Sequence, residues 1–188
     1  MPEQRLVCAG KHLGGRASLV SLRVLSDLYS LTGRSGRPDD FREEELSPVE
    51  RDVAEALLGG GPASTAELPD LVPHERKRVA AAAGRLQRRL VLTAAGNQER
   101  DRGWPSVVLD VLPRRYGEAL RELPEADEAR ARLAAIVLRS VAELSGADLA
   151  AAIGGRRREA EAALDRLVEQ GAARSHDAGG FRLWSKKA

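Results

Sequence analysis

Arginine and lysine side chains concentrate in two stretches of this 188-residue chain, and their chemistry suits contact with a phosphate backbone. Residues 73–116 carry a net charge of +6 and residues 153–188 a net charge of +3. Cations that neutralise phosphates release bound counterions, which gives an affinity that falls steeply with salt. The sequence therefore predicts contact with DNA. The candidate DNA-binding residues are Arg76, Lys77, Arg78, Arg85, Arg88, Arg89, Arg100, Arg102, Arg156, Arg157, Arg158, Lys11 and Arg16.

An acidic stretch precedes each of the two cationic ones. Residues 38–72 carry a net charge of −8 and residues 117–152 a net charge of −3, so the whole chain reaches only +2. Arginine outnumbers lysine 26 to 4 and alanine is abundant, a composition that GC-rich coding produces regardless of function. The alternative interpretation is therefore that the arginines form solvated helix faces.

Other kinds of chemistry find little support in the sequence. No nucleophile stands beside a base, and the run Glu43 to Glu45 is expected to be a solvated loop. The single cysteine, Cys8, lies in an apolar stretch and is expected to be buried, which excludes an internal disulfide. We therefore expect no catalytic residues, no metal site and no cofactor.

Three further features could touch nucleic acid. The glycine-rich segment 10–16 offers Lys11 and Arg16 to a phosphate, although a flexible loop is the alternative. Gln87 and Asn97 carry amides that can pair with adenine edges. Trp104 could stack on a base, but a tryptophan that enters a strand is more often a core residue.

The elements that must position these residues form a repeated pattern. An N-terminal extension over residues 1–46 is predicted to contain one helix, from about Arg16 to Thr32. Residues 47–112 are predicted to form a first module. Its first helix spans 48–58, a short second helix ends at Leu71, and a third helix spans 74–89; strands follow at 91–93 and 105–112.

The same order recurs after a linker at residues 113–124. In residues 125–188 a first helix is predicted over 125–144, a second helix ends at Ile153, and a third spans 156–170. A small hairpin around 177–180 follows. Three helices, a strand, a wing and a strand is the winged-helix order. The predicted fold is therefore mainly α with small β-hairpins (α+β), built as two tandem winged-helix, or helix-turn-helix, domains after a helical extension.

Residues 98–105 read Gln-Glu-Arg-Asp-Arg-Gly-Trp-Pro, behind a cationic helix and ahead of a second module. This arrangement resembles the tandem winged-helix proteins related to the bacterial DNA glycosylases that repair interstrand crosslinks, over roughly residue 10 to the C-terminus. Enzymes of that family are longer, with further winged helices and a β-barrel, and their catalytic motif is glutamine, an apolar residue, then glutamine or aspartate. No such triplet occurs here, because Gln87 precedes Arg88 and Gln98 precedes Glu99. The resemblance thus implies the DNA-binding scaffold without the glycosylase activity.

Three functions remain in competition at this stage. The first is a double-stranded DNA-binding protein in repair or transcription regulation, which uses the third helix and wing of each module. The second is a protein-interaction adaptor built on winged helices, and the third is a minimal glycosylase-like repair enzyme. An apolar N-terminal helix would also suit a homodimer or another protein partner. The lack of a membrane-spanning run or signal-like pattern predicts no membrane partner and a cytoplasmic location, in solution or with the nucleoid.

Overall fold

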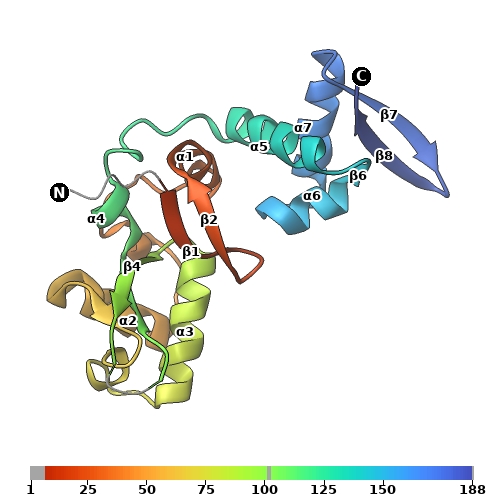
Figure 1. The fold of residues 1–188 in the computed structure, drawn as a ribbon. Coiled ribbons are helices and arrows are strands. Elements are labelled where there is room, and N and C mark those ends of the chain that lie inside the picture. Colours follow the sequence, from red (N-terminus) through yellow and green to blue (C-terminus); the bar gives the residue numbers. More distant parts are fainter. Residues whose placement is uncertain (1–6, 101–102, 188) are drawn as a thin grey trace. The chain divides into compact units, whose positions relative to one another are not determined.

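The computed structural model of the chain describes residues 7–100 and 103–187. The chain divides into two compact units (Figure 1). Unit 1 comprises Met1–Leu25 and Arg34–Glu122, and unit 2 comprises Ser26–Gly33 and Leu123–Ala188. Helices alternate with short strands in both units, which confirms the predicted α+β class.

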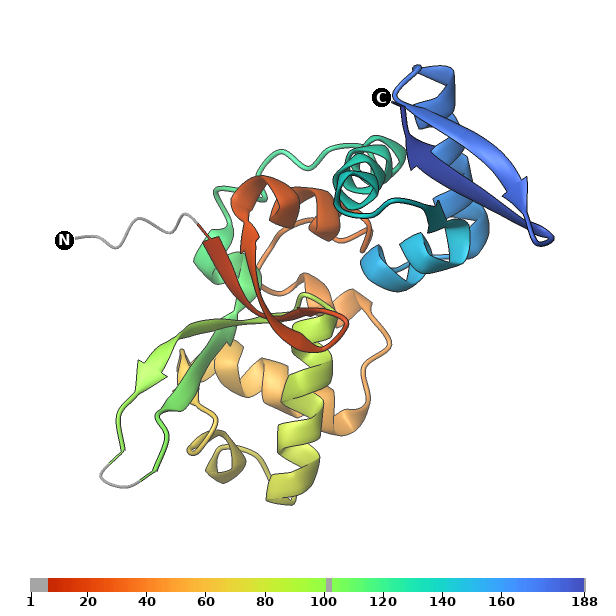
Figure 2. The same cartoon turned by 45° about the vertical axis from the view of Figure 1, so that its right-hand side comes forward.

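Unit 1 is built on a five-stranded sheet with the strand order β2-β1-β4-β5-β3. Its helices α2 and α3 pack on one another and against this sheet, and Figure 2 shows the β1–β2 hairpin passing close to the C-terminal end of α3. The elements are β1 (Val7–Leu13), β2 (Arg16–Ser21), the start of α1 (Leu22–Ser30), the short 3-10 helix η1 (Asp40–Glu43), α2 (Pro48–Gly60), β3 (Ala63–Ser64), the 3-10 helix η2 (Leu68–Asp70), α3 (Arg76–Arg88), β4 (Leu92–Gln98), β5 (Ser106–Val111) and α4 (Leu112–Tyr116).

The N-terminal segment departs from the sequence prediction. The expected helix begins at Leu22 rather than Arg16, and residues 7–21 form a β-hairpin whose strand β1 joins the sheet by pairing Ala9 with Ala94. Residues 16–21 pair with β1 in antiparallel register, from Arg16 opposite Leu13 to Ser21 opposite Val7, and this pairing outweighs the helical spacing of the leucines that follow. The expected loop at 10–16 is a strand and the tight turn of that hairpin.

Local capping fixes where the helices of unit 1 begin. Ser47 accepts a hydrogen bond from the Glu50 backbone amide, Glu50 reaches back to the Ser47 amide, and Pro48 occupies the first helical position. Ser64 and Glu67 make the same reciprocal bonds, but Pro69 follows and only a 3-10 turn forms there. The predicted second helix is therefore shorter than expected. The core between the helices and the sheet includes Leu57, Leu86, Leu92, Leu109 and Val111, all fully buried.

Unit 2 contains the end of α1, the helices α5, α6 and α7, and a three-stranded sheet with the order β6-β8-β7. The sequence merged α5 and β6 into one helix, whereas Val141 is extended and the helix stops at Ser140. A Ser145–Asp148 capping box starts α6, and the core gathers around Trp184, Leu149 and Leu164. The elements are α5 (Ala126–Ser140), β6 (Leu144–Ser145), α6 (Gly146–Ile153), α7 (Arg157–Glu169), β7 (Ala173–Ala178) and β8 (Phe181–Lys186).

Within the described ranges, no helix combines the length and the apolar character that a membrane span requires.

Candidate nucleic-acid interface

The first turn of α3 presents three consecutive cations to solvent. Arg76, Lys77 and Arg78 are all exposed, because the apolar stripe that starts at Val79 turns the opposite face of the helix into the core. Arg76 makes loose contacts, at 3.8 Å to Asp70 and at 3.3 Å to the Ala66 carbonyl. Positive charge at a helix N-terminus opposes the helix dipole and costs a few tenths of a kcal/mol per residue. An external anion would remove that cost.

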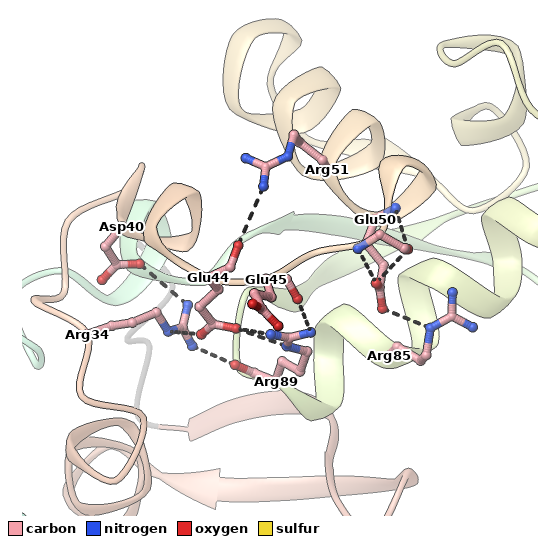
Figure 3. Close-up of polar contacts among 9 residues, drawn as sticks. Arg34, Asp40, Glu44, Glu45, Glu50, Arg51, Arg85 and Arg89 are labelled. Carbon is pink, nitrogen blue, oxygen red and sulfur yellow. Dashed lines mark hydrogen bonds and ion pairs between the residues drawn. The ribbon is translucent and has the colours of Figure 1, made fainter.

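The second half of α3 is tied to acidic residues. Arg85 Nε donates to Glu50 Oε1 at 2.8 Å, and Arg89, which ends the helix, donates from Nε to Glu44 Oε2 at 2.9 Å (Figure 3). Arg34 reaches the same carboxylate at 2.9 Å. Of the predicted DNA-binding residues, Arg85 and Arg89 thus also stabilise the fold.

Two acidic residues ahead of α3, Glu44 and Glu50, have structural roles. Glu44 was expected in a solvated run, yet its side chain is only 19 % exposed, because the two arginines cover it. The Glu50 side chain is 7 % exposed. Burial alone would raise the pKa of Glu50, but the hydrogen bonds from Ser47 and Arg85 outweigh burial and lower the pKa below its ordinary value. The prediction of a fully solvated acidic run was wrong at Glu44.

The β1–β2 hairpin lies beside the C-terminal end of α3. The Lys11 backbone amide donates to Gln87 Oε1 at 3.2 Å, and Arg88 packs its side chain against Gly15, next to Arg16. Lys11, Arg16 and Arg88 are all exposed. The hairpin and the helix therefore supply cations to one region of unit 1, which the sequence alone did not indicate.

Gln87 does not read bases in this arrangement. It is 7 % exposed, its side-chain nitrogen donates to the Ala83 carbonyl at 3.4 Å, and its side-chain oxygen accepts from the Lys11 amide at 3.2 Å; its backbone carbonyl oxygen lies 2.9 Å from His12 Nδ1. The proposed base-reading role of Gln87 is therefore wrong, because the side chain is used to join α3 to β1. Asn97 remains exposed on β4.

The connection between β4 and β5 carries exposed polar and aromatic groups. Gln98 Nε2 donates to Glu67 Oε1 at 3.0 Å, and Arg100 is exposed. Trp104 is 91 % exposed, so the prediction that it packs in the core was wrong. Gly103, with a φ of 88°, and Pro105 flank it just before β5 begins. Arg102 lies outside the described residues.

In unit 2, Arg156, Arg157 and Arg158 are exposed at the start of α7. Arg157 Nε donates to Glu161 Oε1 at 2.7 Å, whereas Arg158 lines a cavity described below. Trp184 is fully buried, and its indole nitrogen donates to Asp165 at 3.0 Å under the guanidinium of Arg182. The start of α7 therefore carries a cluster of exposed cations.

Cys8 and His12, whose side chains are of types used in catalysis, are both buried. Cys8 is fully buried with Sγ 3.3 Å from both His12 Nε2 and Thr93 Oγ1, and burial raises the pKa of its thiol. Burial likewise lowers the pKa of His12, which keeps it neutral. Among the residues with described positions, no cluster of three or more His, Cys, Asp and Glu side chains could hold a metal ion.

Comparison with known proteins gives the relationship of the chain. It belongs to the AlkZ-like DNA glycosylase family, because residues 13–188 match the sequence model of that family. Its structure is similar to that of the Streptomyces sahachiroi DNA glycosylase AlkZ, with a TM-score of 0.63 and 16 % sequence identity, over 97 % of this chain. The chain spans 53 % of that protein's length. No curated protein matches the sequence. The relation to the interstrand-crosslink repair glycosylases, first indicated by residues 98–105, is confirmed.

Proposed function

We propose that this protein binds double-stranded DNA in the service of DNA repair, and that unit 1 supplies the main contact through a winged-helix arrangement. In this proposal α3 enters the major groove and the β4–β5 connection acts as the wing. The main support for this proposal is that Arg76, Lys77 and Arg78 are exposed at the N-terminal end of α3. Phosphates would relieve the unfavourable charge there, and family membership supports DNA as the partner.

The hairpin β1–β2 extends the proposed surface. Lys11, Arg16 and Arg88 lie where a phosphate backbone could follow the end of α3. Arg85 and Arg89 are assigned a supporting role, because their guanidinium groups are held by Glu50 and Glu44. Exposed cations that lack strong partners should contribute more to binding than those already paired with carboxylates.

Trp104 gives the wing a group that reads shape rather than sequence. An indole that is 91 % exposed loses apolar hydration when it stacks on a base or enters the minor groove. We assign this contact to Trp104 with support from Arg100. The same features would serve a transcription regulator, but the family relation favours repair.

The test is a fluorescence-anisotropy titration of a labelled random duplex of about 25 base pairs, which spans more than two helical turns, at several salt concentrations. The triple variant Lys77→Ala/Arg78→Ala/Arg88→Ala should weaken binding and flatten the salt dependence by about three phosphate contacts. Arg121→Ala, an exposed arginine of unit 1 far along the chain from α3, is the matched control. Equal loss in the control, or salt-independent binding, would contradict the proposal.

A DNA glycosylase activity is the second candidate, and the family match favours it. The catalytic triplet of the related enzymes is missing from this sequence, and the chain spans about half of AlkZ. Release of a modified base from alkylated duplex DNA, measured against a buffer control, tests this activity directly. Release by the wild type would make the protein an enzyme, and DNA binding without release would leave it a binding module.

A further inference from the structure

A cavity of about 370 Å³ lies within unit 2, between α5 and the start of α7. Small side chains at Ala162 and Ala163 leave the space open, and charged side chains surround it. Four of these are cations and two are anions, so the lining is positive overall. The charged lining residues are Asp127, Arg130, Arg156, Arg158, Glu159 and Arg166.

Arg130 is the feature of this cavity that points to a ligand. The residue is 8 % exposed, and its Nη2 lies 3.0 Å from Glu159 Oε2. Its Nε and Nη1 are buried and have no hydrogen-bond partner. A buried guanidinium donor without an acceptor is costly, so the cavity is short of acceptor atoms.

The glycine at position 155 leaves room for the guanidinium group of Arg130. Gly155 has a φ of 96°, and a Cβ at that position would lie 2.5 Å from Nη1 of Arg130. Any side chain at 155 would therefore displace the guanidinium. Glycine at this turn satisfies both the positive φ and the close approach.

The carboxylate of Glu159 is already engaged, and Arg158 and Arg166 are exposed at the cavity. Oε2 of Glu159 accepts from both Arg130 and the backbone amide of Arg156, so that carboxylate oxygen is already shared by two donors. Arg158 and Arg166 are exposed, and a spacing of eight residues puts both on the face of α7 that holds Ala162. Guanidinium forks of this kind match tetrahedral oxyanions.

We propose that unit 2 binds an oxyanion of the phosphate class in this cavity, with Arg130 at its base and Arg158 and Arg166 at its rim. The anion supplies the acceptors that Arg130 lacks and offsets the positive charge of the lining. The site stands apart from the proposed DNA contact of unit 1, because it uses none of that unit's residues. Its ligand is either a free phosphate or a phosphodiester of bound DNA, which share this chemistry.

Isothermal titration of the full chain with inorganic phosphate, against sodium chloride at equal ionic strength, tests the site. Phosphate should bind the wild type, and Arg158→Ala/Arg166→Ala should weaken binding by at least about tenfold, as expected for lost charge-assisted hydrogen bonds. Arg157→Ala is the matched control, because Arg157 is adjacent and exposed but does not line the cavity. Arg130→Met should abolish binding, with circular dichroism as the check on folding. No phosphate heat beyond that of chloride, or equal losses in the control and the double variant, would overturn the proposal.

Adding duplex DNA to the phosphate-loaded chain distinguishes the two sources. Displacement of phosphate by DNA assigns the site to a DNA phosphodiester, and retention of phosphate on DNA-saturated protein assigns it to a free anion. Both results support the site. If the chain binds no DNA at all, the proposed function fails, but the phosphate titration still decides whether this site exists.

Discussion

Replacing Arg85 and Arg88 separately should divide fold stability from DNA binding, although both residues lie on α3. Arg85 holds Glu50, whose side chain is 7 % exposed, at 2.8 Å, whereas Arg88 is exposed and rests on the glycine turn of the hairpin. In Arg85→Ala the buried carboxylate keeps only its hydrogen bonds to Ser47, at 3.0 Å and 2.6 Å. The two variants should therefore fail in different assays.

The magnitude follows from the exposure of each partner. A hydrogen bond between charged groups contributes about 1.5–3 kcal/mol, and the Arg85 side chain is 44 % exposed, so solvent screening favours the low end. We expect Arg85→Ala to cost about 1.5 kcal/mol, or roughly 6 °C in Tm at about 4 °C per kcal/mol. Arg88→Ala should stay within about 0.5 kcal/mol of the wild type, as is usual for exposed sites.

Urea unfolding followed by far-UV circular dichroism measures the first effect, and anisotropy with duplex DNA measures the second. Arg88→Ala should weaken DNA binding without changing the urea midpoint. Arg85→Ala should move the midpoint more than it moves the DNA affinity of the folded protein. If Arg85→Ala is as stable as the wild type, the Glu50 ion pair does not support the fold. The charge reversal Arg85→Glu would place a second carboxylate beside Glu50, so it would confuse unfolding with lost binding.

Three further outcomes are expected. Because hydrogen bonds lower the pKa of Glu50 despite its burial, its stabilising effect is present above the unfolded pKa of about 4.3 and is lost as pH falls through the lower folded value. The stability difference between wild type and Glu50→Gln in urea should therefore shrink below about pH 4, and a constant difference would contradict this cause. Duplex DNA should shield Trp104 from iodide quenching while buried Trp184 stays unaffected; unchanged quenching would remove Trp104 from the interface. In unit 2, Arg132 Nε donates to Asp27 Oδ1 at 3.0 Å, and the Asp27 side chain is 2 % exposed. Arg132→Ala removes this donor and should lower the free energy of unfolding in urea by about 2 kcal/mol. A change below about 0.5 kcal/mol would mean that the pair is not stabilising.

The sequence was sufficient at several places where local contacts decide the structure. Capping residues such as Ser47 and Ser145 place the starts of α2 and α6, and the apolar stripe from Val79 to Leu86 determines which face of α3 is buried. These features depend on contacts three or four residues apart, so a single sequence contains them. The α+β class follows from their order.

The N-terminal hairpin could not be predicted in the same way, because its partner is distant. Strand β1 pairs with β4 some 85 residues later, and Gln87 is buried only because that strand covers it. Glu44 likewise becomes structural through Arg89, 45 residues away. Long-range partners convert residues that look like solvated or base-reading groups into parts of the core.

The cations of α3 differ in their surroundings, although the sequence makes them look alike. Arg89, Arg85 and Lys77 are equally basic in the sequence, yet the first two face carboxylates from residues 44–50 and the third faces solvent. The acidic stretch that precedes α3 therefore pairs with Arg85 and Arg89, whereas Arg88 and the cations of the first turn stay exposed. A positive first turn is unfavourable for the isolated helix, and under the proposed function DNA phosphates would supply the negative charge that offsets it.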